Sequence, residues 1–172
     1  MENESLPSTP FPPPQPIEMQ TLEYPLWDDQ RIDVCRDEEI AFFWESRPKP
    51  PVRTSPLAGG MLGSPCEFLL KSVRVDFLSR MPEPILDEIA NQVTVNMGLG
   101  VRSMFDLPLS IANRILTSDE KPQRCWRLKV PETKIPPLTH VSVRLLHTAI
   151  RDDIEPFKVR LYLEGDLTCP RF

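Results

Sequence analysis

The sequence predicts an α+β fold: a mostly antiparallel sheet with helices packed on one face, preceded by a disordered, proline-rich N-terminal tail. Three observations support this prediction. Twelve of the 21 prolines lie before residue 66. After that residue, apolar and polar side chains alternate as in strands in four segments, and two segments between them show helical spacing. We therefore divide the chain into a tail with a hinge, residues 1–65, and a globular domain, residues 66–172.

The tail combines proline with acidic charge. Proline fixes its own φ and lacks an amide donor, so the prolines at 12–14 predict an extended polyproline II segment. Eleven acidic and five basic side chains precede Cys66, so the tail carries −6 and the domain +1 of the formal net charge of −5. The acidic pI of 5.1 therefore describes the tail and leaves room for a basic face on the domain. Glycines within 57–65 predict the hinge.

Six elements are predicted in the domain: a strand at 67–78, helices at 83–98 and 106–118, and strands at 125–130, 140–150 and 157–167. In the first strand, Val73 and Val75 alternate with Arg74. Pro84 and Pro108 suit the first turn of a helix, and apolar residues follow each of them at helical spacing. The linker between the last two strands is short enough for an antiparallel hairpin.

Cationic side chains recur at the polar positions of the three closing strands. They are Arg127, Lys129, Arg144, Lys158 and Arg160. If these strands are neighbours, the five residues share one face and contact phosphates, in RNA or in anionic lipid headgroups, without sequence specificity. The alternative is an ordinary solvent-facing surface balanced by acids such as Glu132 and Glu164. No aromatic motif of the RNP type accompanies the patch, so base-specific readout is not expected.

Residue patterns for catalysis or metal binding do not converge, and we predict a non-enzymatic protein without a cofactor or metal. His140 and His147 are an odd number of residues apart on one predicted strand, so they face opposite sides of the sheet. The sequence has no glycine-rich phosphate loop and no nucleophile elbow. Four scattered cysteines predict free thiols in a reducing compartment. No apolar stretch reaches the length of a membrane span, so any membrane contact is predicted to be peripheral.

Short motifs in the tail suggest ligands of other proteins. Residues 7–10, PSTP, resemble the late-domain motif of enveloped viruses, with Thr9 where alanine is usual, and 11–16, FPPPQP, resemble a ligand of EVH1-type grooves. Residues 48–53, PKPPVR, have the Pro-x-x-Pro-x-Arg spacing of SH3 ligands. A stiff spacer is the alternative interpretation of all three. The tail-motif candidates are Pro7, Pro10, Phe11, Pro12, Pro13 and Pro14.

Two aromatic clusters interrupt the polar tail, LEYPLW at 22–27 and IAFFW at 40–44. A tail that cannot build its own core docks such side chains on its own domain or on another molecule, and the sequence leaves both choices open. The candidate anchors are Tyr24, Trp27, Phe42, Phe43 and Trp44.

The layout of the chain resembles rhabdovirus matrix proteins, in particular the short ones of plant cytorhabdoviruses. The resemblance rests on PSTPFPPPQP in the tail, FFW ahead of the hinge, FLLKSVRVDFL followed by PEPILDEIANQV, and the closing FKVRLYLEGDL. It implies a structural virion protein that self-associates, binds the nucleocapsid and bridges it to the inner membrane leaflet during assembly and budding. Such a protein is expected in the virion and in the host cytoplasm at the membrane periphery.

The tail is acidic, whereas the N-terminal region of this family is often basic. Membrane attraction is therefore expected from the sheet face or from the apolar segment 97–105, MGLGVRSMF. The alternative function is a cytoplasmic adaptor whose proline-rich tail recruits host SH3-type or EVH1-type domains.

Overall fold

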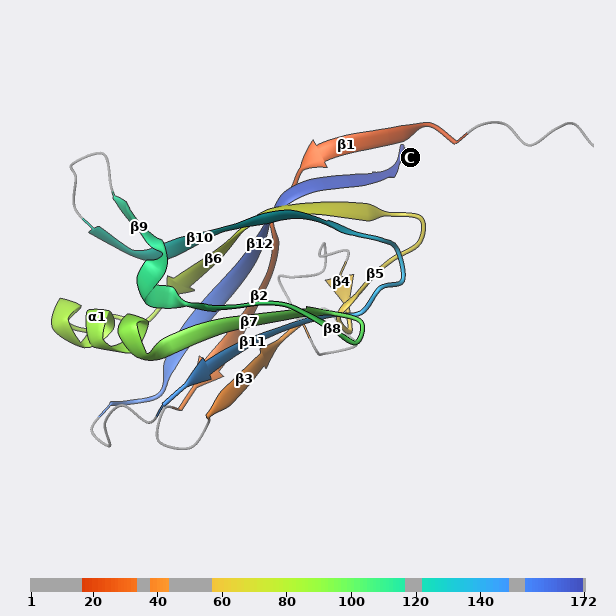
Figure 1. The fold of residues 1–172 in the computed structure, drawn as a ribbon. Helices are drawn as coiled ribbons and strands as arrows, with labels where there is room; N and C mark the ends of the chain where they lie inside the picture. Colours follow the sequence, from red (N-terminus) through yellow and green to blue (C-terminus); the bar gives the residue numbers. More distant parts are fainter. Residues whose placement is uncertain (1–16, 34–37, 44–56, 117–121, 149–153, 172) are drawn as a thin grey trace, which may run out of the picture.

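The computed structural model describes residues 17–33, 38–43, 57–116, 122–148 and 154–171, which form two large antiparallel sheets, a two-stranded hairpin and one α-helix (Figure 1). Sheet A contains β1 (Met19–Glu23), β2 (Leu26–Ile32), β6 (Glu67–Phe77), β9 (Asn113–Leu116), β10 (Pro122–Ile135) and β12 (Phe157–Pro170). Sheet B contains β3 (Glu39–Phe42), β7 (Val93–Leu99), β8 (Arg102–Pro108) and β11 (Val141–His147). The remaining elements are the hairpin β4 (Leu57–Ala58) and β5 (Met61–Leu62), the helix α1 (Glu83–Gln92) and a 3-10 turn at Leu109–Ile111.

Strand β12 pairs with three other strands of sheet A. One of its edges pairs with β6 from Val159 to Thr168, and β6 pairs in turn with β10 and β10 with β9. The other edge of β12 is shared: β2 pairs with its first half and β1 with its last residues. Sheet B has the order β3, β11, β7, β8.

The predicted α+β fold with helices on one sheet face is wrong, because strands make up 65% of the described residues and α1 is their one α-helix. The helix predicted at 83–98 ends at Gln92, and the residues after it, 93–98, belong to β7. The segment 106–118 contains the end of β8, the 3-10 turn and β9. The consecutive β-branched residues at 93–95 favour extended backbone. Short apolar runs fit both the helical and the strand period, so spacing alone misassigned them.

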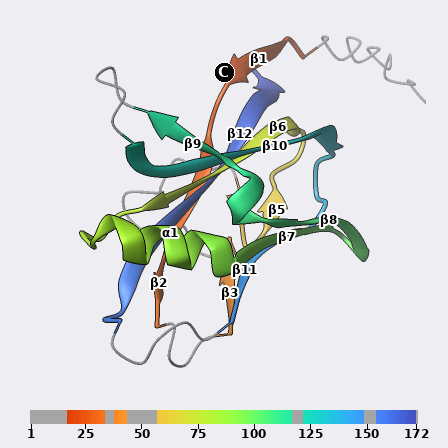
Figure 2. The same cartoon turned by 60° about the vertical axis from the view of Figure 1, so that its left-hand side comes forward.

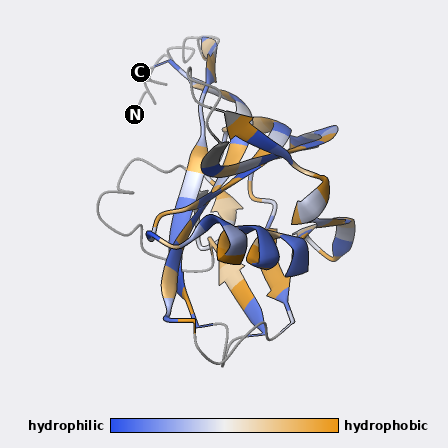
Figure 3. Ribbon diagram, turned by 90° about the vertical axis from the view of Figure 1, so that its left-hand side faces the viewer, coloured by the Kyte–Doolittle hydropathy of each residue, from blue (hydrophilic) through white to orange (hydrophobic). Residues whose placement is uncertain are grey.

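The two sheets share one hydrophobic core. Alternate residues of β2, β6, β10 and β12 face alternate residues of β3, β7 and β11, and all belong to one buried cluster. Leu86, Ile89 and Ala90 of α1 join the same cluster, and the helix lies at the left-hand end of the fold in Figure 1 and in front of the strands in Figure 2. Figure 3 shows hydrophobic and hydrophilic residues alternating along the strands. Each sheet thus has one apolar inner face and one polar outer face.

Segments that the sequence analysis assigned to the tail are strands of this core. Leu26 in β2 and Phe42 in β3 are 0% and 1% exposed, and Phe43 is also buried. Tyr24 packs against the core from the corner between β1 and β2. The aromatic anchors Tyr24, Phe42 and Phe43 therefore dock on their own chain. Trp44, the tail motif at 7–14 and the SH3-type motif at 48–53 lie outside the described residues.

Asp28 connects the two sheets. Its side chain lies on the inner face of β2, and its Oδ2 accepts hydrogen bonds from the backbone N–H of Phe43, at 2.8 Å, and from Nε2 of Gln30, at 3.0 Å. A buried carboxylate requires such donors. Phe43 has a φ of 61°, a left-handed conformation that is uncommon for an aromatic residue. The bond to Asp28 fixes this conformation where the chain leaves β3.

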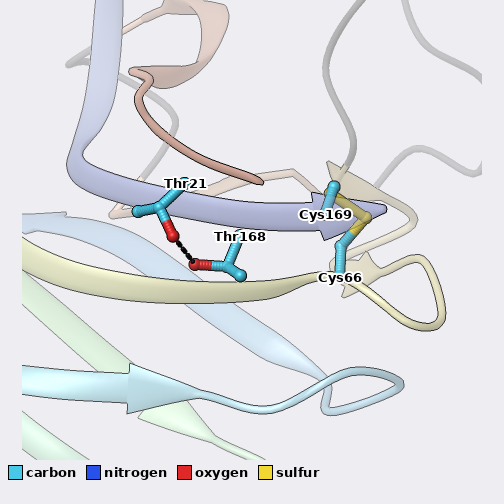
Figure 4. Close-up of a disulfide and its surroundings, with 4 residues drawn as sticks. All are labelled: Thr21, Cys66, Thr168 and Cys169. Atoms are coloured by element: carbon cyan, nitrogen blue, oxygen red, sulfur yellow. Dashed lines mark hydrogen bonds between the residues drawn. A yellow bond between two sulfur atoms is a disulfide. The ribbon is translucent and has the colours of Figure 1, made fainter. Parts of the chain in front are cut away.

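A disulfide joins Cys66 and Cys169, which corrects the expectation of free thiols for these two residues (Figure 4). Glu67 pairs with Thr168 across β6 and β12, so the two cysteines meet at the end of this strand pair with Cα atoms 4.4 Å apart. The hydroxyl groups of Thr168 and Thr21 of β1 form a 2.9 Å hydrogen bond with each other (Figure 4). The sequence separation of 103 residues concealed this pairing from sequence reasoning.

Candidate binding surfaces

The outer face of sheet A carries a surface that we name the basic face. Cross-strand partners share a face, so the register places its members together. They are Trp27, Asp29 and Arg31 of β2, Lys158, Arg160, Tyr162 and Glu164 of β12, Ser72, Arg74 and Asp76 of β6, and Arg127 and Lys129 of β10. Six members are cationic and three are anionic, so the face retains a positive charge.

Four of the five predicted cationic residues belong to the basic face, and the fifth does not. Arg127 and Lys129 lie on β10 and Lys158 and Arg160 on β12, but these strands are separated by β6 instead of being neighbours. Arg144 lies on β11 in sheet B, where its Nη1 is 3.0 Å from Oε1 of Glu39. Alternation along a strand shows which residues share a side, but not which sheet the strand joins.

Arginines neutralise the acids of the basic face. The carboxylate of Glu164 lies 2.8 Å from Arg127 Nε and 3.2 Å from Arg74 Nη1. It also accepts a 2.7 Å hydrogen bond from Ser72 Oγ. Arg74 also contacts Asp76 at 3.3 Å, and Arg160 contacts Asp29 at 3.7 Å. Burial lowers the pKa of Arg74, but Asp76, Tyr162 and Glu164 raise it by more, and the net shift is upward. These three guanidinium groups therefore form a fixed, charged network.

Three cations remain outside this network. Arg31, Lys129 and Lys158 are exposed and form no ion pair with any described residue. Lys129 lies at one end of the face, and Arg31 and Lys158, which are cross-strand partners, lie at the other. They are the groups that can exchange water for the phosphates of a ligand.

A pocket of about 410 Å³ opens beside this network, at the β-bulge between Glu164 and Gly165. Its lining residues are Glu23, Tyr24, Pro25, Lys71, Ser72, Arg74, Arg127, Glu164 and Gly165. Lys71 pairs with Asp166 at 2.8 Å at its rim. The pocket extends the basic face towards the corner between β1 and β2.

A second surface, which we name the apolar end, is formed by Met61, Val101 and Leu138. These side chains are 46%, 103% and 67% exposed and come from strand β5, from the turn between β7 and β8 and from the loop between β10 and β11. Residues around His140 connect these segments: His140 pairs with Met61 in a β-bridge, and its carbonyl accepts the Gly100 N–H at 2.7 Å. The Leu138 N–H donates to the Leu62 carbonyl at 3.0 Å. The three tips are therefore held together.

The apolar end includes part of the segment 97–105 that the sequence singled out. Met97 is fully buried in β7, whereas Val101 occupies the two-residue turn between β7 and β8 together with Gly100, whose φ is 58°. Polar residues are usual in such turns. The turn geometry does not require a fully exposed valine at this position.

No three His, Cys, Asp or Glu side chains among the described residues are placed to hold a metal ion. His140 precedes β11 and is exposed at the apolar end, whereas His147 is the last residue of β11 and is buried. Burial raises the pKa of the Cys125 thiol to about 12, which keeps it protonated at neutral pH and makes it a poor nucleophile. Among the described helices, none has the length and apolar character of a membrane span.

Comparisons with known proteins identify no relative. No protein-family model, no curated protein and no solved structure matches this chain.

Proposed function

We propose that this protein is a matrix-type structural protein of an enveloped virus, which binds the inner leaflet of the membrane with its apolar end and the nucleocapsid with its basic face. The observation that carries the proposal is the presence of both surfaces on one β scaffold. The resemblance in chain layout to rhabdovirus matrix proteins motivates the same assignment. Self-association belongs to the proposal, because many weak contacts combine into strong attachment when copies assemble.

The positions of the two surfaces suit a bridge. Arg31 and Lys158 lie beside the end of β6 at Phe77, whereas the apolar end lies near the beginning of β6 at Glu67. The eleven residues of β6 separate these positions by roughly 30 Å at the usual rise of a strand. One molecule can therefore contact a membrane and a second ligand at the same time.

The composition of the three segments at the apolar end favours a lipid surface. Residues 59–66, 98–105 and 136–143 contain no acidic side chain, and Arg102 lies next to Val101. Insertion of these tips would bury aliphatic side chains without taking a carboxylate out of water, which is the costly part of membrane contact. A cation at the rim would meet anionic headgroups.

Replacing Val101 with aspartate tests the membrane contact. We expect the fraction of protein that sediments with phosphatidylserine-containing vesicles to fall about tenfold or more, because a charge replaces buried apolar area at the tip. The matched control is Ile111→Asp, since Ile111 is 62% exposed and lies beyond the opposite end of β8. If Val101→Asp and Ile111→Asp bind vesicles as the unmodified protein does, the membrane half of the proposal is wrong.

A further inference from the structure

The sequence pattern predicts phosphate contacts without base recognition, but the register of sheet A brings aromatic rings into the middle of the basic face. Trp27 is the cross-strand partner of Tyr162, Tyr162 of Arg74, and Arg74 of Arg127. These four residues form one row across β2, β12, β6 and β10. At the usual distance between strands the row is about 14 Å long.

Each ring of the row is covered by an arginine. The guanidinium carbon of Arg160 lies 4.1 Å from the ring centre of Trp27, and that of Arg74 lies 3.7 Å from the ring centre of Tyr162. Both distances are typical of cation–π contacts. The arginines are held in turn by Asp29, Asp76 and Glu164. The rings and guanidinium groups are therefore positioned before any ligand binds, which lowers the cost of binding.

The core does not require these aromatic residues. The inner side of the same strands is filled by Leu26, Leu161 and Leu163, all 0% exposed, while Trp27 and Tyr162 remain partly exposed on the solvent side. Aromatic rings and arginine planes on a sheet surface are the groups on which unpaired bases stack. Arg31, Lys158 and Lys129, which form no ion pair within the described part of the chain, lie beyond the row on both sides, where a backbone that crosses it would carry phosphates.

We infer that the row Trp27–Tyr162–Arg74–Arg127 binds single-stranded RNA by base stacking, with Arg31, Lys129 and Lys158 on the phosphates. This inference rests on the proposed function, since it names single-stranded RNA as the nucleocapsid component that the basic face contacts. A lipid headgroup would contact the same cations but would not stack on the rings. A duplex hides its bases within the stack, so the row selects unpaired strands.

The test measures fluorescence anisotropy of three labelled 12-mers with the full chain: oligouridine, an abasic strand with the same phosphates, and a duplex. We expect oligouridine to bind about tenfold or more tightly than the abasic strand, because stacking of even one base is worth this much. The double variant Trp27→Leu/Tyr162→Leu should lose this preference, and Trp27→Phe/Tyr162→Phe should keep most of it. Vesicle binding, which uses the other end of the molecule, reports whether each variant is folded.

A charge variant separates the two parts of the site. Arg31→Ala/Lys129→Ala/Lys158→Ala should weaken binding of oligouridine and abasic strand equally, and it should reduce the slope of log affinity against log salt by about two. If the unmodified protein binds both strands equally well, stacking is wrong while the nucleocapsid contact stands. If it binds none of the three probes at low salt, both the inference and the nucleocapsid half of the proposed function are wrong.

Discussion

Replacing Leu26 with alanine is expected to lower the free energy of unfolding by about 3 kcal/mol. Leu26 begins β2, pairs with Leu163 of β12 and is 0% exposed. Truncation removes apolar contacts and leaves a cavity between the sheets, and the paired strand limits how far the site can collapse. Urea denaturation followed by circular dichroism measures the change, and an unchanged m-value shows that the extent of unfolding is the same.

The matched control is Leu22→Ala in the neighbouring strand β1. Leu22 has the same side chain four positions earlier but is 51% exposed, so its truncation is expected to change stability by no more than about 0.5 kcal/mol. If residues 1–65 were a detached tail, neither substitution would change the free energy of unfolding. Equal small changes in the free energy of unfolding would therefore show that β2 is not part of the core.

Replacing Gly165 with alanine is expected to destabilise the protein by about 3 kcal/mol. Gly165 lies at the bulge where β12 passes Leu69 of β6, and a Cβ there would collide with the Leu69 carbonyl oxygen and lie 2.9 Å from its carbon. Both obstacles are backbone atoms of a paired strand, so neither can move without breaking the ladder. Thermal unfolding monitored by circular dichroism is a sufficient measurement.

Gly63→Ala provides the comparison for this substitution. A Cβ at Gly63 meets nothing within 4 Å, so the same chemical change there is expected to alter stability by no more than about 0.5 kcal/mol. Equal melting temperatures for the two variants would contradict the close approach of β12 to β6.

Local patterns predicted four strands, assigned β7 and β9 to helices, and gave no signal for two strands whose partners are distant in the sequence. The strands expected at 67–78, 125–130, 140–150 and 157–167 correspond to β6, β10, β11 and β12, because alternation of apolar and polar side chains over six or more residues favours a strand. The strands β2 and β3 were missed. Proline and acidic residues around them suggested a tail, and their partners in β12 and β11 lie more than 100 residues away in the sequence.

The candidate site was predictable in its charges but not in its aromatic residues. Arg127, Lys129, Lys158 and Arg160 could be placed on the polar side of their strands from alternation alone. Trp27 joins them only through the pairing of β2 with β12, and Arg74 was assigned to a strand without being recognised as part of the patch. Arg144 was misplaced because no local signal shows that β11 belongs to the other sheet.

The central claim is that one molecule connects a membrane to single-stranded RNA, and vesicle flotation with labelled RNA tests it directly. With phosphatidylserine-containing vesicles and the unmodified protein, we expect the RNA to float, whereas without protein it should stay at the bottom of the gradient. Val101→Asp should leave both protein and RNA at the bottom. Arg31→Ala/Lys129→Ala/Lys158→Ala should float with the vesicles and leave the RNA behind. If the unmodified protein floats while the RNA remains at the bottom, or if neither substitution changes the result, the bridging account is contradicted.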